Sequence, residues 1–291
     1  MKISNIIIYE TVEIDNPYLV IGFSGWPNAG EVSTGSLQYL KDRFNAKKLG
    51  EIISDSFYNF STLRPTTVIE NGYIKRTSMV TNDIFYCRNE KSHKDLFIII
   101  AEEPHLRWNE YNKAVIDFAK HYGIKEIYIL GGTYDNILHT AEPKVSAVTN
   151  DDLFKDKLIK NGIELISYTG ACSIHTLILE AGNKAHIPSL SLWGHVPPYI
   201  QRNPKAFYAV LEKLLILLEI DFNIEELKYA ARALDDQINT IISQNPTLKK
   251  YIKDLKTKQN ARQDVHRPVK FDKVIPIEEF LKKGKKDTEK E

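Results

Sequence analysis

Short β-branched apolar runs alternate with segments in which apolar residues recur every three or four positions, through about residue 220. Runs bounded by Gly, Asp or Pro are typical of strands covered on both faces, and the longer spacing is typical of amphipathic helices. We expect a first strand at 6–9 and further strands at 18–23, 95–100, 126–130, 164–168 and 188–193. We expect helices at 30–44, 108–122, 151–160, 173–184 and 204–218. This alternation predicts a mostly parallel sheet with crossover helices on its faces.

One segment departs from the alternation and predicts a β-arm. Asn71 and Gly72 lie between two alternating runs, 67–70 and 73–75, and an Asn-Gly pair in this position is a strong signal of a hairpin. Residues 84–88 would add a further strand before the one at 95–100. We therefore expect an antiparallel arm next to a mixed edge of the sheet.

The pattern changes after Asp221, where a narrow apolar stripe runs along otherwise polar sequence. Its members are Ile224, Leu227, Ala231, Leu234, Ile238 and Ile241, followed after Pro246 by Leu248, Tyr251, Ile252 and Leu255. Pro246 is a favoured helix start, so the stripe predicts a helical hairpin of coiled-coil character. Two short helices with so narrow a stripe bury little by themselves, and we expect this hairpin to mediate self-association.

These patterns predict the organisation of the chain. Its 291 residues suffice for one large domain and an appendage. We expect an α/β domain at 1–222, the helical hairpin at 223–264, and a mostly extended or disordered tail at 265–291. Residues 282–291 are rich in Lys and Glu and poor in apolar residues, which is typical of disorder.

Composition excludes several classes of protein. Hydrophobic residues make up 43% and charged residues 26%, as in ordinary folded proteins. Lys and Arg number 39 against 38 Asp and Glu, so the formal net charge of +1 favours neither nucleic acid nor an anionic membrane. No run approaches the ~20 apolar residues that span a bilayer, and we expect no membrane partner. Cys87 and Cys172 are not spaced for a disulfide framework or a zinc site, which fits a reducing cytoplasm.

The stretch 249–270 is the one strongly basic part of the sequence, with an excess of about six positive charges. One interpretation is a solvated helix face, and the other is a docking surface for an acidic partner. Tyr251 is its only aromatic residue, which is too few for stacking on single-stranded nucleic acid. We therefore expect this stretch to act through protein contacts, without a nucleic-acid partner.

Three Gly-containing loops follow predicted strands, and the first is Gly22–Gly30. A phosphate-binding loop would end in Gly-Lys-Ser/Thr, but Gly30 is followed by Glu31, whose carboxylate repels phosphate. A nucleophile elbow would need Gly two residues after Ser24, where Trp26 stands. A tight structural turn with Trp26 as a packed anchor is the favoured interpretation.

The second loop comprises Gly131–Tyr134 and, after it, His139–Pro143. It follows the strand at 126–130, and the carboxyl ends of parallel strands form the crevice where open α/β sheets bind ligands. Asp135, His139 and Glu142 could form an acid–base group there. Three polar residues are also what an ordinary exposed loop contains, so a ligand site without catalysis is the favoured interpretation.

The third loop is Thr169–Ser173, on the same edge of the sheet. Cys172 near a helix start could have a lowered pKa, but a buried structural cysteine is the favoured interpretation. His186 and His195 flank the strand at 188–193 without a partner at ligand spacing, so we interpret both as structural or surface residues. The sequence contains no His-Glu-x-x-His motif and no metal-binding carboxylate cluster.

The three loops together predict a structural or recognition groove, with no catalytic residue, no cofactor and no metal. The residues of this groove are Gly25, Trp26, Asn28, Gly30, Gly131, Gly132, Thr133, Tyr134, His139, Glu142, Thr169 and Gly170.

Four motifs occur in order within residues 1–222. They are Gly25-Trp-Pro-Asn-Ala-Gly30; Gly131-Gly-Thr-Tyr134 with His139-Thr-Ala-Glu-Pro143; Thr169-Gly170; and Asn203-Pro-Lys-Ala206. In these motifs the chain resembles the PAC2 family, the proteasome assembly chaperone 2 family with its archaeal and bacterial relatives, in which Asp usually replaces Asn28. The resemblance implies a three-layer α/β/α domain similar to nucleoside phosphorylases, without enzymatic activity.

The resemblance also implies a function and partners: a non-enzymatic protein-assembly factor that pairs with itself as a homo-oligomer, with proteasome subunits or with another PAC2-like chain. Family members that dock into proteasome ring pockets end in a hydrophobic residue, Tyr and one further residue. This chain ends in Glu289-Lys290-Glu291, so docking by that mechanism is not expected.

The alternative is a small-molecule enzyme of nucleoside or phosphate type, which would use the crevice at the C-terminal ends of the strands. A phosphorylase needs Arg or Lys to hold phosphate, but the three loops contain no Arg and only Lys144 adjoins them. The assembly factor is therefore the favoured interpretation.

Overall fold

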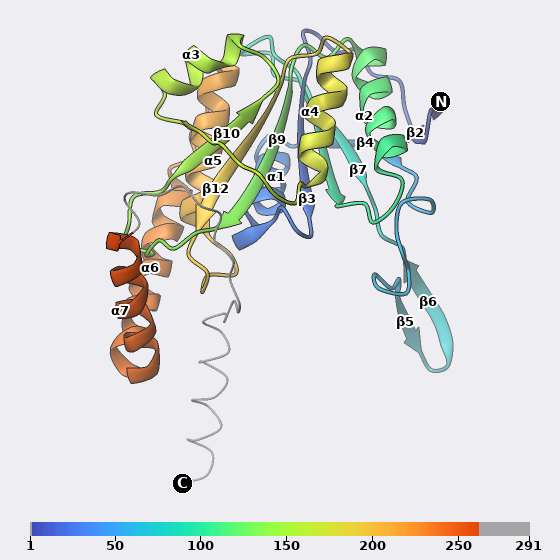
Figure 1. The fold of residues 1–291 in the computed structure, drawn as a ribbon. Coiled ribbons are helices and arrows are strands. Elements are labelled where there is room, and N and C mark those ends of the chain that lie inside the picture. Colours follow the sequence, from blue (N-terminus) through green and yellow to red (C-terminus); the bar gives the residue numbers. More distant parts are fainter. Residues whose placement is uncertain (1, 262–291) are drawn as a thin grey trace.

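The computed structural model describes residues 2–261, and helices cover both faces of its ten-stranded sheet (Figure 1). The strands of this sheet are β1 (Lys2–Ile3), β2 (Ile6–Ile8), β3 (Tyr18–Ser24), β4 (Lys47–Ile52), β7 (Asp83–Cys87), β8 (Leu96–Glu102), β9 (Ile127–Tyr134), β10 (Val145–Thr149), β11 (Glu164–Leu165) and β12 (Ser189–Val196). Their order across the sheet is β1-β2-β4-β7-β8-β3-β9-β12-β10-β11.

The centre of the sheet is parallel, because β8, β3, β9 and β12 are neighbours that run in the same direction. On one side β7, β4 and β2 continue it antiparallel, and on the other side β10 pairs antiparallel with β12. The central strands are apolar along their length because both of their faces are covered, as in β3, where Leu19–Phe23 is buried throughout. The predicted α/β class is confirmed, with a parallel centre and antiparallel flanks.

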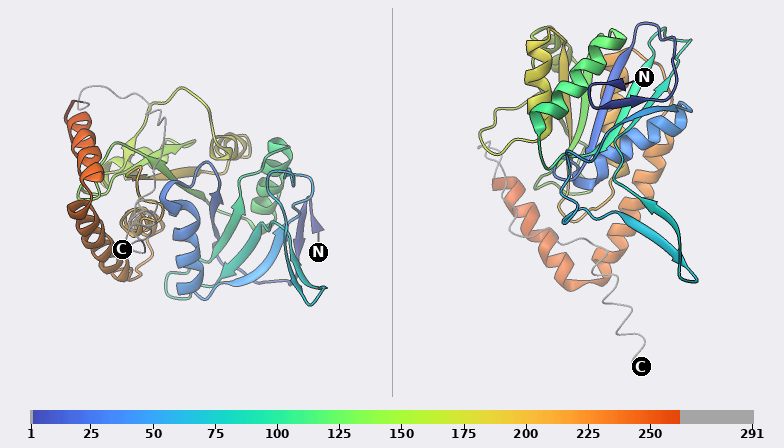
Figure 2. Two further views of the ribbon diagram at one scale, coloured as in Figure 1. Left: turned by 90° about the horizontal axis from the view of Figure 1, so that it is seen from below. Right: turned by 90° about the vertical axis from the view of Figure 1, so that its right-hand side faces the viewer.

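Helices α2 (Trp108–Tyr122) and α4 (Ile174–Lys184) cover one face of the sheet, and α1 (Val32–Arg43) and α5 (Pro204–Leu218) cover the other (Figure 2). The α5 helix starts where the sequence predicts it. Pro204 occupies its first turn, and the Oδ1 atom of Asn203 accepts a hydrogen bond from the Ala206 N–H at 3.2 Å. Four helices on two faces complete the three-layer arrangement.

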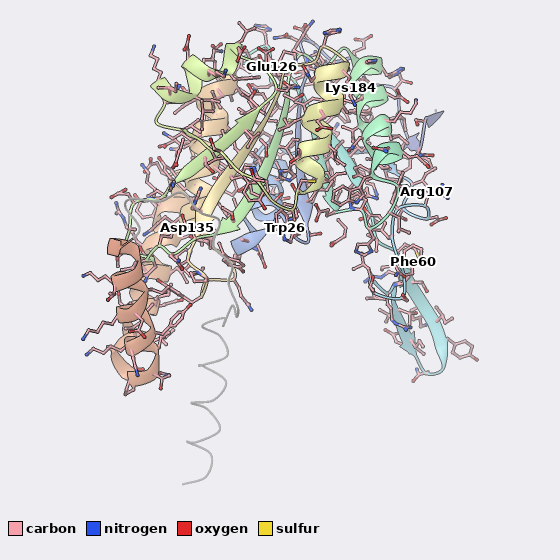
Figure 3. The ribbon with its side chains drawn as sticks, viewed as in Figure 1. Trp26, Phe60, Arg107, Glu126, Asp135 and Lys184 are labelled. Atoms are coloured by element: carbon pink, nitrogen blue, oxygen red, sulfur yellow. The ribbon has the colours of Figure 1, made fainter. Side chains whose placement is uncertain are left out.

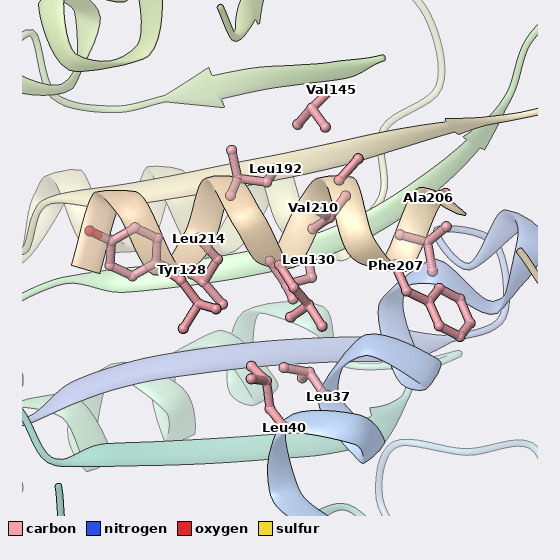
Figure 4. Packing of buried hydrophobic residues seen from close by; sticks show 14 of the residues in the cluster. Leu37, Leu40, Tyr128, Leu130, Val145, Leu192, Ala206, Phe207, Val210 and Leu214 are labelled. Carbon is pink, nitrogen blue, oxygen red and sulfur yellow. The ribbon is translucent and has the colours of Figure 1, made fainter. Parts of the chain in front are cut away.

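The two faces enclose two apolar clusters. In the larger one, Tyr128 and Leu130 of β9 point toward α5, and Leu37 and Leu40 of α1 lie on the same side of the sheet (Figure 4). A shorter helix, α3 (Leu153–Lys160), adds Phe154 and Leu158 to this cluster. No helix within residues 2–261 is long and apolar enough to cross a membrane.

The C-terminal stripe forms the predicted helical hairpin, α6 (Glu226–Gln244) and α7 (Pro246–Ala261). Its apolar residues are buried against the chain's own core: Leu227, Ile238, Leu248 and Leu255 belong to the larger cluster together with α5. The stripe therefore has its partner within the same chain, and the reason for expecting self-association through it no longer applies. The predicted tail at 265–291, and the basic stretch beyond residue 261, lie outside the described residues.

The predicted β-arm is confirmed. Strands β5 (Thr66–Glu70) and β6 (Tyr73–Ser78) form a separate two-stranded sheet, joined by Asn71 and Gly72 with positive φ angles of 52° and 82°. Figure 1 shows this arm projecting beyond the carboxyl ends of the central strands, on the opposite side of the molecule from α6 and α7.

One predicted strand is wrong. The sequence predicts a buried strand at 164–168, but only Glu164–Leu165 is a strand, and residues 165–172 are exposed. An apolar run such as Leu165-Ile166 can lie at the edge of a sheet as well as in its buried centre, so the sequence pattern does not distinguish the two positions. Three strands escaped the sequence analysis: the two-residue strand β1, β4, which contains two lysines and a glycine, and β10, which follows the second loop.

His175, in the first turn of α4, is a buried histidine between helix and sheet. Its Nδ1 atom lies 2.9 Å from the Ser191 Oγ, its ring packs 4.7 Å from the Trp193 ring, and its Nε2 atom has no hydrogen-bond partner. Burial lowers the pKa of His175 to about 3, because a charged imidazolium would be desolvated there. The folded protein therefore holds His175 neutral.

This burial makes stability depend on pH. The unfolded chain protonates His175 near pH 6.5 and the folded chain only near pH 3, so the free energy of unfolding should fall as pH decreases through that window, by up to about 1.4 kcal/mol per pH unit. Urea unfolding of the wild type and His175→Gln at several pH values measures it. The difference between the free energies of unfolding of the two proteins should shrink toward low pH. A difference that stays constant with pH would contradict the prediction.

Candidate functional site

The first predicted loop was Gly22–Gly30, but Gly22–Ser24 belong to β3. The segment that follows, Gly25–Glu31, lies directly on the end of β9. The Gly132 N–H donates to the Pro27 carbonyl oxygen at 2.8 Å, and Asn28 and Gly132 pair as an isolated parallel bridge. A side chain at position 132 would overlap the carbonyl oxygen of Ala29, so only glycine permits this approach. The loop therefore fills the crevice between the carboxyl ends of β3 and β9.

Asn28 joins this loop to the first turn of α1. Its Oδ1 atom accepts from the Thr34 N–H at 3.1 Å, and its Nδ2 atom donates to the Thr34 hydroxyl at 2.9 Å. Bonds of this kind at a helix start satisfy backbone N–H groups that have no partner within the helix. Asn28 thus holds the loop in place.

Trp26 is the exposed part of the same loop. Its side chain is 61% exposed, although the backbone around it is held by hydrogen bonds on both sides. Figure 3 shows Trp26 at the lower edge of the sheet, between the arm and the helical hairpin. The sequence analysis expected a packed anchor, and this expectation is wrong because the loop is fixed by its backbone instead.

Glu103 is a residue of this region that the sequence analysis missed. Its Oε1 atom accepts from the Ile174 N–H at 2.9 Å, and the backbone N–H of Trp26 also donates to its carboxylate. Burial raises the pKa of Glu103 above its ordinary value, while these two N–H groups act in the opposite direction. One carboxylate thus ties the start of α4 to the Trp26 loop. Its only signal in the sequence is its place after a buried strand.

His139 connects the second loop to the helical hairpin. Its backbone N–H donates to the Tyr199 hydroxyl oxygen at 2.9 Å, its Nδ1 atom also lies 2.9 Å from that oxygen, and its Nε2 atom lies 3.0 Å from the Oδ1 of Asn239 on α6. Since Oδ1 only accepts, Nε2 carries the proton and Nδ1 accepts from Tyr199. His139 is buried and fully bonded.

Lys205 reinforces the same connection from the start of α5. Its Nζ atom donates to the His139 carbonyl oxygen and to the Asp235 Oδ2 of α6, the latter at 2.5 Å. Arg202, another cation of this region, pairs with Glu31 at 2.7 Å. Both cations are therefore engaged by carboxylates of the same chain.

The structure also brings together Asp135, His195 and Ser146, which the sequence analysis did not connect. His195 donates from Nδ1 to the Asp135 Oδ2 at 2.9 Å, and the Ser146 Oγ lies 2.9 Å from His195 Nε2. Burial by itself raises the pKa of Asp135, but the bonds from His195 and from the Asn136 N–H outweigh it and hold that pKa below its ordinary value. This is the order of orienter, base and nucleophile found in serine hydrolases.

Ser146, however, is only 1% exposed. It lies within β10 and pairs with Trp193 of β12 and with Glu164 of β11. A nucleophile must reach a substrate carbonyl, and this hydroxyl is buried. The hydrogen-bonded series Asp135–His195–Ser146, called the relay below, therefore links the end of β9 to β12 and β10 in the folded state.

The space beside the second loop is small. A cavity of about 10 Å³, room for one water molecule, is lined by Glu142, His139, His195, Lys205 and Asp235. Among residues 2–261, no group of three or more His, Cys, Asp or Glu side chains could hold a metal ion. The arrangement can hold loops and helices in place, and this cavity is too small for a nucleotide.

The predicted groove residues are only partly brought together. Asn28 pairs with Gly132, but Gly25 lies beside Glu102 and Glu103, and Gly30 lies beside Val196. Thr133 and Tyr134 are half-buried at the end of β9. Thr169 and Gly170 lie on the exposed segment before α4, where Tyr168 bonds to Ala171 at 2.9 Å. Cys172 is exposed, so its interpretation as a buried cysteine is wrong.

Removing the acceptor that α6 offers to His139 should weaken the hairpin's attachment. We expect Asn239→Ala to lower the free energy of unfolding by about 1 kcal/mol, the usual net contribution of one hydrogen bond. Gln237→Ala, at an exposed position of the same helix, is the matched control and should change it little. Urea unfolding of both variants measures the effect, and equal losses would show that the bond contributes nothing.

Comparison with known proteins identifies relatives of this chain. A solved PAC2 family protein from Streptomyces avermitilis is 26% identical, with a TM-score of 0.72 over 81% of this chain and 99% of that chain. A Mycobacterium tuberculosis proteasome-assembly chaperone homologue shares the fold at 24% identity, with a TM-score of 0.73 and the same two coverages. An uncharacterized protein of Methanocaldococcus jannaschii is 25% identical over 78% of this chain and 84% of its own length.

The family assignment follows from a match along most of the chain. The model of the PAC2 family matches residues 22–242. The matched region extends from the end of β3 into α6, so it includes the closed crevice and the residues that hold the hairpin. This protein belongs to the PAC2 family.

Proposed function

We propose that this protein is a non-enzymatic assembly factor that acts in the cytoplasm through protein contacts and self-association. The observation that carries the proposal is the closed crevice. Where an enzyme with this kind of sheet would bind its substrate, the Gly25–Glu31 loop lies on Gly132. The cavity beside the second loop holds about one water molecule. The polar side chains around this cavity, His139, Lys205 and Asp235, are hydrogen-bonded within the chain.

The outer surface of the same edge suits a protein partner. Trp26 is exposed on a loop held by its backbone, and such rigid aromatic residues often dominate binding energies at interfaces. The β5–β6 arm adds exposed apolar side chains, including the cross-strand pair Ile69 and Ile74. A two-stranded sheet has little stability of its own in water, which favours contact with another protein.

Proteasome subunits, or another chain of the same fold, are the partners we propose. The Mycobacterium tuberculosis relative is described as a proteasome-assembly chaperone homologue, which supports this class of partner at the level of the fold. The free cysteines, Cys87 and Cys172, fit a reducing compartment. For nucleic acid the support is weaker, because Tyr251 packs against Tyr199 at a centroid distance of 6.4 Å and is engaged within the chain.

The proposal is tested by capture of partners on the full chain. Tagged protein from the native host should recover proteasome α subunits, identified by mass spectrometry and then repeated with purified α subunits. Trp26→Ala should weaken binding about tenfold or more, because loss of a central aromatic anchor costs over ~1.4 kcal/mol. Tyr229→Ala removes a similarly exposed aromatic residue on α6 and is the control. Recovery without any α subunit would contradict the proteasome link.

A second candidate function rests on the Asp135–His195–Ser146 relay, whose geometry is that of a serine hydrolase. For the nucleoside or phosphate alternative the support is weaker, since Lys144 pairs with Glu164 at 2.6 Å and Lys205 with Asp235 at 2.5 Å. Two paired lysines leave little charge to bind a phosphate.

Covalent labelling distinguishes the two candidates. Because the Ser146 hydroxyl is buried, we expect a fluorophosphonate probe to leave the folded protein unlabelled. Trypsin under the same conditions is the positive control, and Ser146→Ala is the matched variant. Labelling of the wild type that Ser146→Ala and His195→Gln both abolish would establish a reactive serine and favour the hydrolase.

A further inference from the structure

The β5–β6 arm carries exposed apolar side chains on both of its faces. Ile69 and Ile74 pair across the two strands, and the Ile74 side chain is 72% exposed. The next pair, Glu70 and Tyr73, lies on the opposite face, where the Tyr73 side chain is 73% exposed. A partner that contacted one face alone would leave the other face in water. The arm therefore suits a groove that encloses it.

Buried hydrogen bonds attach one end of the arm to the large sheet. Asn82, between β6 and β7, is fully buried. Its carbonyl oxygen accepts from the Ile52 N–H at 3.0 Å, and its Nδ2 atom donates to the Ile52 carbonyl oxygen at 3.2 Å. The arm thus projects from a fixed base, away from α5 and α6 on the other side of the molecule (Figure 1). A surface that covers it has to come from outside the chain.

A groove of about 570 Å³ lies between the end of α5 and the start of α6, and we call it the α5–α6 groove. Its volume is within the range of roughly 300–1,000 Å³ that is usual for binding sites. Its apolar lining comprises Leu215, Ile216, Ile220, Phe222 and Ile224. Its charged lining consists of carboxylates alone, those of Glu212, Glu219, Asp221 and Glu225.

The charges of the arm and of the α5–α6 groove are opposite. Lys75 and Arg76, on β6, have side chains without a hydrogen bond or ion pair to any other residue of 2–261. In the groove, the Asp221 carboxylate is likewise unpaired within that part of the chain. The other three carboxylates form ion pairs with lysines at the surface, where such pairs contribute little and stay accessible to a further cation.

A second groove, of about 380 Å³ between α2 and α4, suits the arm less well. Its charged lining contains three lysines and two carboxylates, those of Lys113, Lys120, Lys184, Asp117 and Glu180. The lysines would repel Lys75 and Arg76 of the arm, because like charges brought together at an interface oppose association. Charge therefore favours the α5–α6 groove.

We propose that the β5–β6 arm of one copy of this chain binds in the α5–α6 groove of a second copy. The apolar side chains of the arm pack on the apolar lining, and Lys75 and Arg76 lie near the carboxylates. Arm and groove are different surfaces on opposite sides of one chain, so the contact is head-to-tail. This inference deepens the self-association in the proposed function and rests on it.

The test places a carboxylate on either side of the contact. Ile74→Asp changes the arm and Ile216→Asp the groove, both at exposed positions. At ~100 μM, light scattering should give the wild type a mass of two or more chains and each variant the mass of one, because an unpaired charge is costly to bury. Ile159→Asp, at an exposed position of α3, is the matched control and should keep the wild-type mass. Circular dichroism checks that each variant is folded.

A mixture of the two variants tests the head-to-tail geometry. The Ile74→Asp chain keeps an intact groove, and the Ile216→Asp chain keeps an intact arm. An equimolar mixture should therefore form a particle of two chains and nothing larger. A mixture that stays monomeric would overturn the proposal.

Reversal of the arm's charges tests the choice of groove. Lys75→Glu combined with Arg76→Glu should raise the Kd of self-association about tenfold or more, because carboxylates would then face carboxylates. An unchanged Kd would show that the arm does not bind in the α5–α6 groove.

The outcomes separate this inference from the proposed function. A monomeric wild type at ~100 μM would contradict both the self-association and this contact. If the wild type associates but Ile74→Asp and Ile216→Asp keep its mass, another surface joins the copies and only this contact is wrong. If Ile74→Asp alone dissociates the copies, the arm binds elsewhere and the groove assignment is wrong. Capture of proteasome subunits, tested through Trp26, bears on the partner class alone.

Discussion

The site depends on one close approach, between the Pro27–Ala29 backbone and the end of β9 at Gly132. The Gly132 N–H bonds to the Pro27 oxygen, and the carbonyl oxygen of Ala29 occupies the space that any side chain at position 132 would need. This contact closes the crevice between β3 and β9. It also sets where α1 begins, through the bonds of Asn28 to Thr34, and it leaves Trp26 at the surface.

Because the crevice is closed, we interpret the function of this protein as contact with other proteins through its surface, and not as catalysis in the crevice. The two histidines that could act as acid or base are both engaged: His139 with Tyr199 and Asn239, and His195 with Asp135 and Ser146. Engaged and buried groups position the backbone around them. The exposed features that suit a partner lie outside the crevice, on the Trp26 loop and on the β5–β6 arm.

Hydrogen bonds from the second loop and from the start of α5 also position the helical hairpin. His139 and Lys205 bond to α6, and the apolar stripe of α6 and α7 packs into the core shared with α5. The apolar stripe is therefore covered within the chain.

The sequence by itself determined the class of fold, most element positions and the loops that meet at the carboxyl ends of the strands, because apolar periodicity and caps such as Asn203-Pro204 are local properties. Contacts between distant segments were decided only by the tertiary structure. Ser146 and His195 are 49 positions apart and meet through strand order, and Glu103 reaches Ile174 across 71 positions. The edge position of residues 164–168 was likewise invisible, since an apolar run has the same pattern whether a neighbouring strand covers it or not.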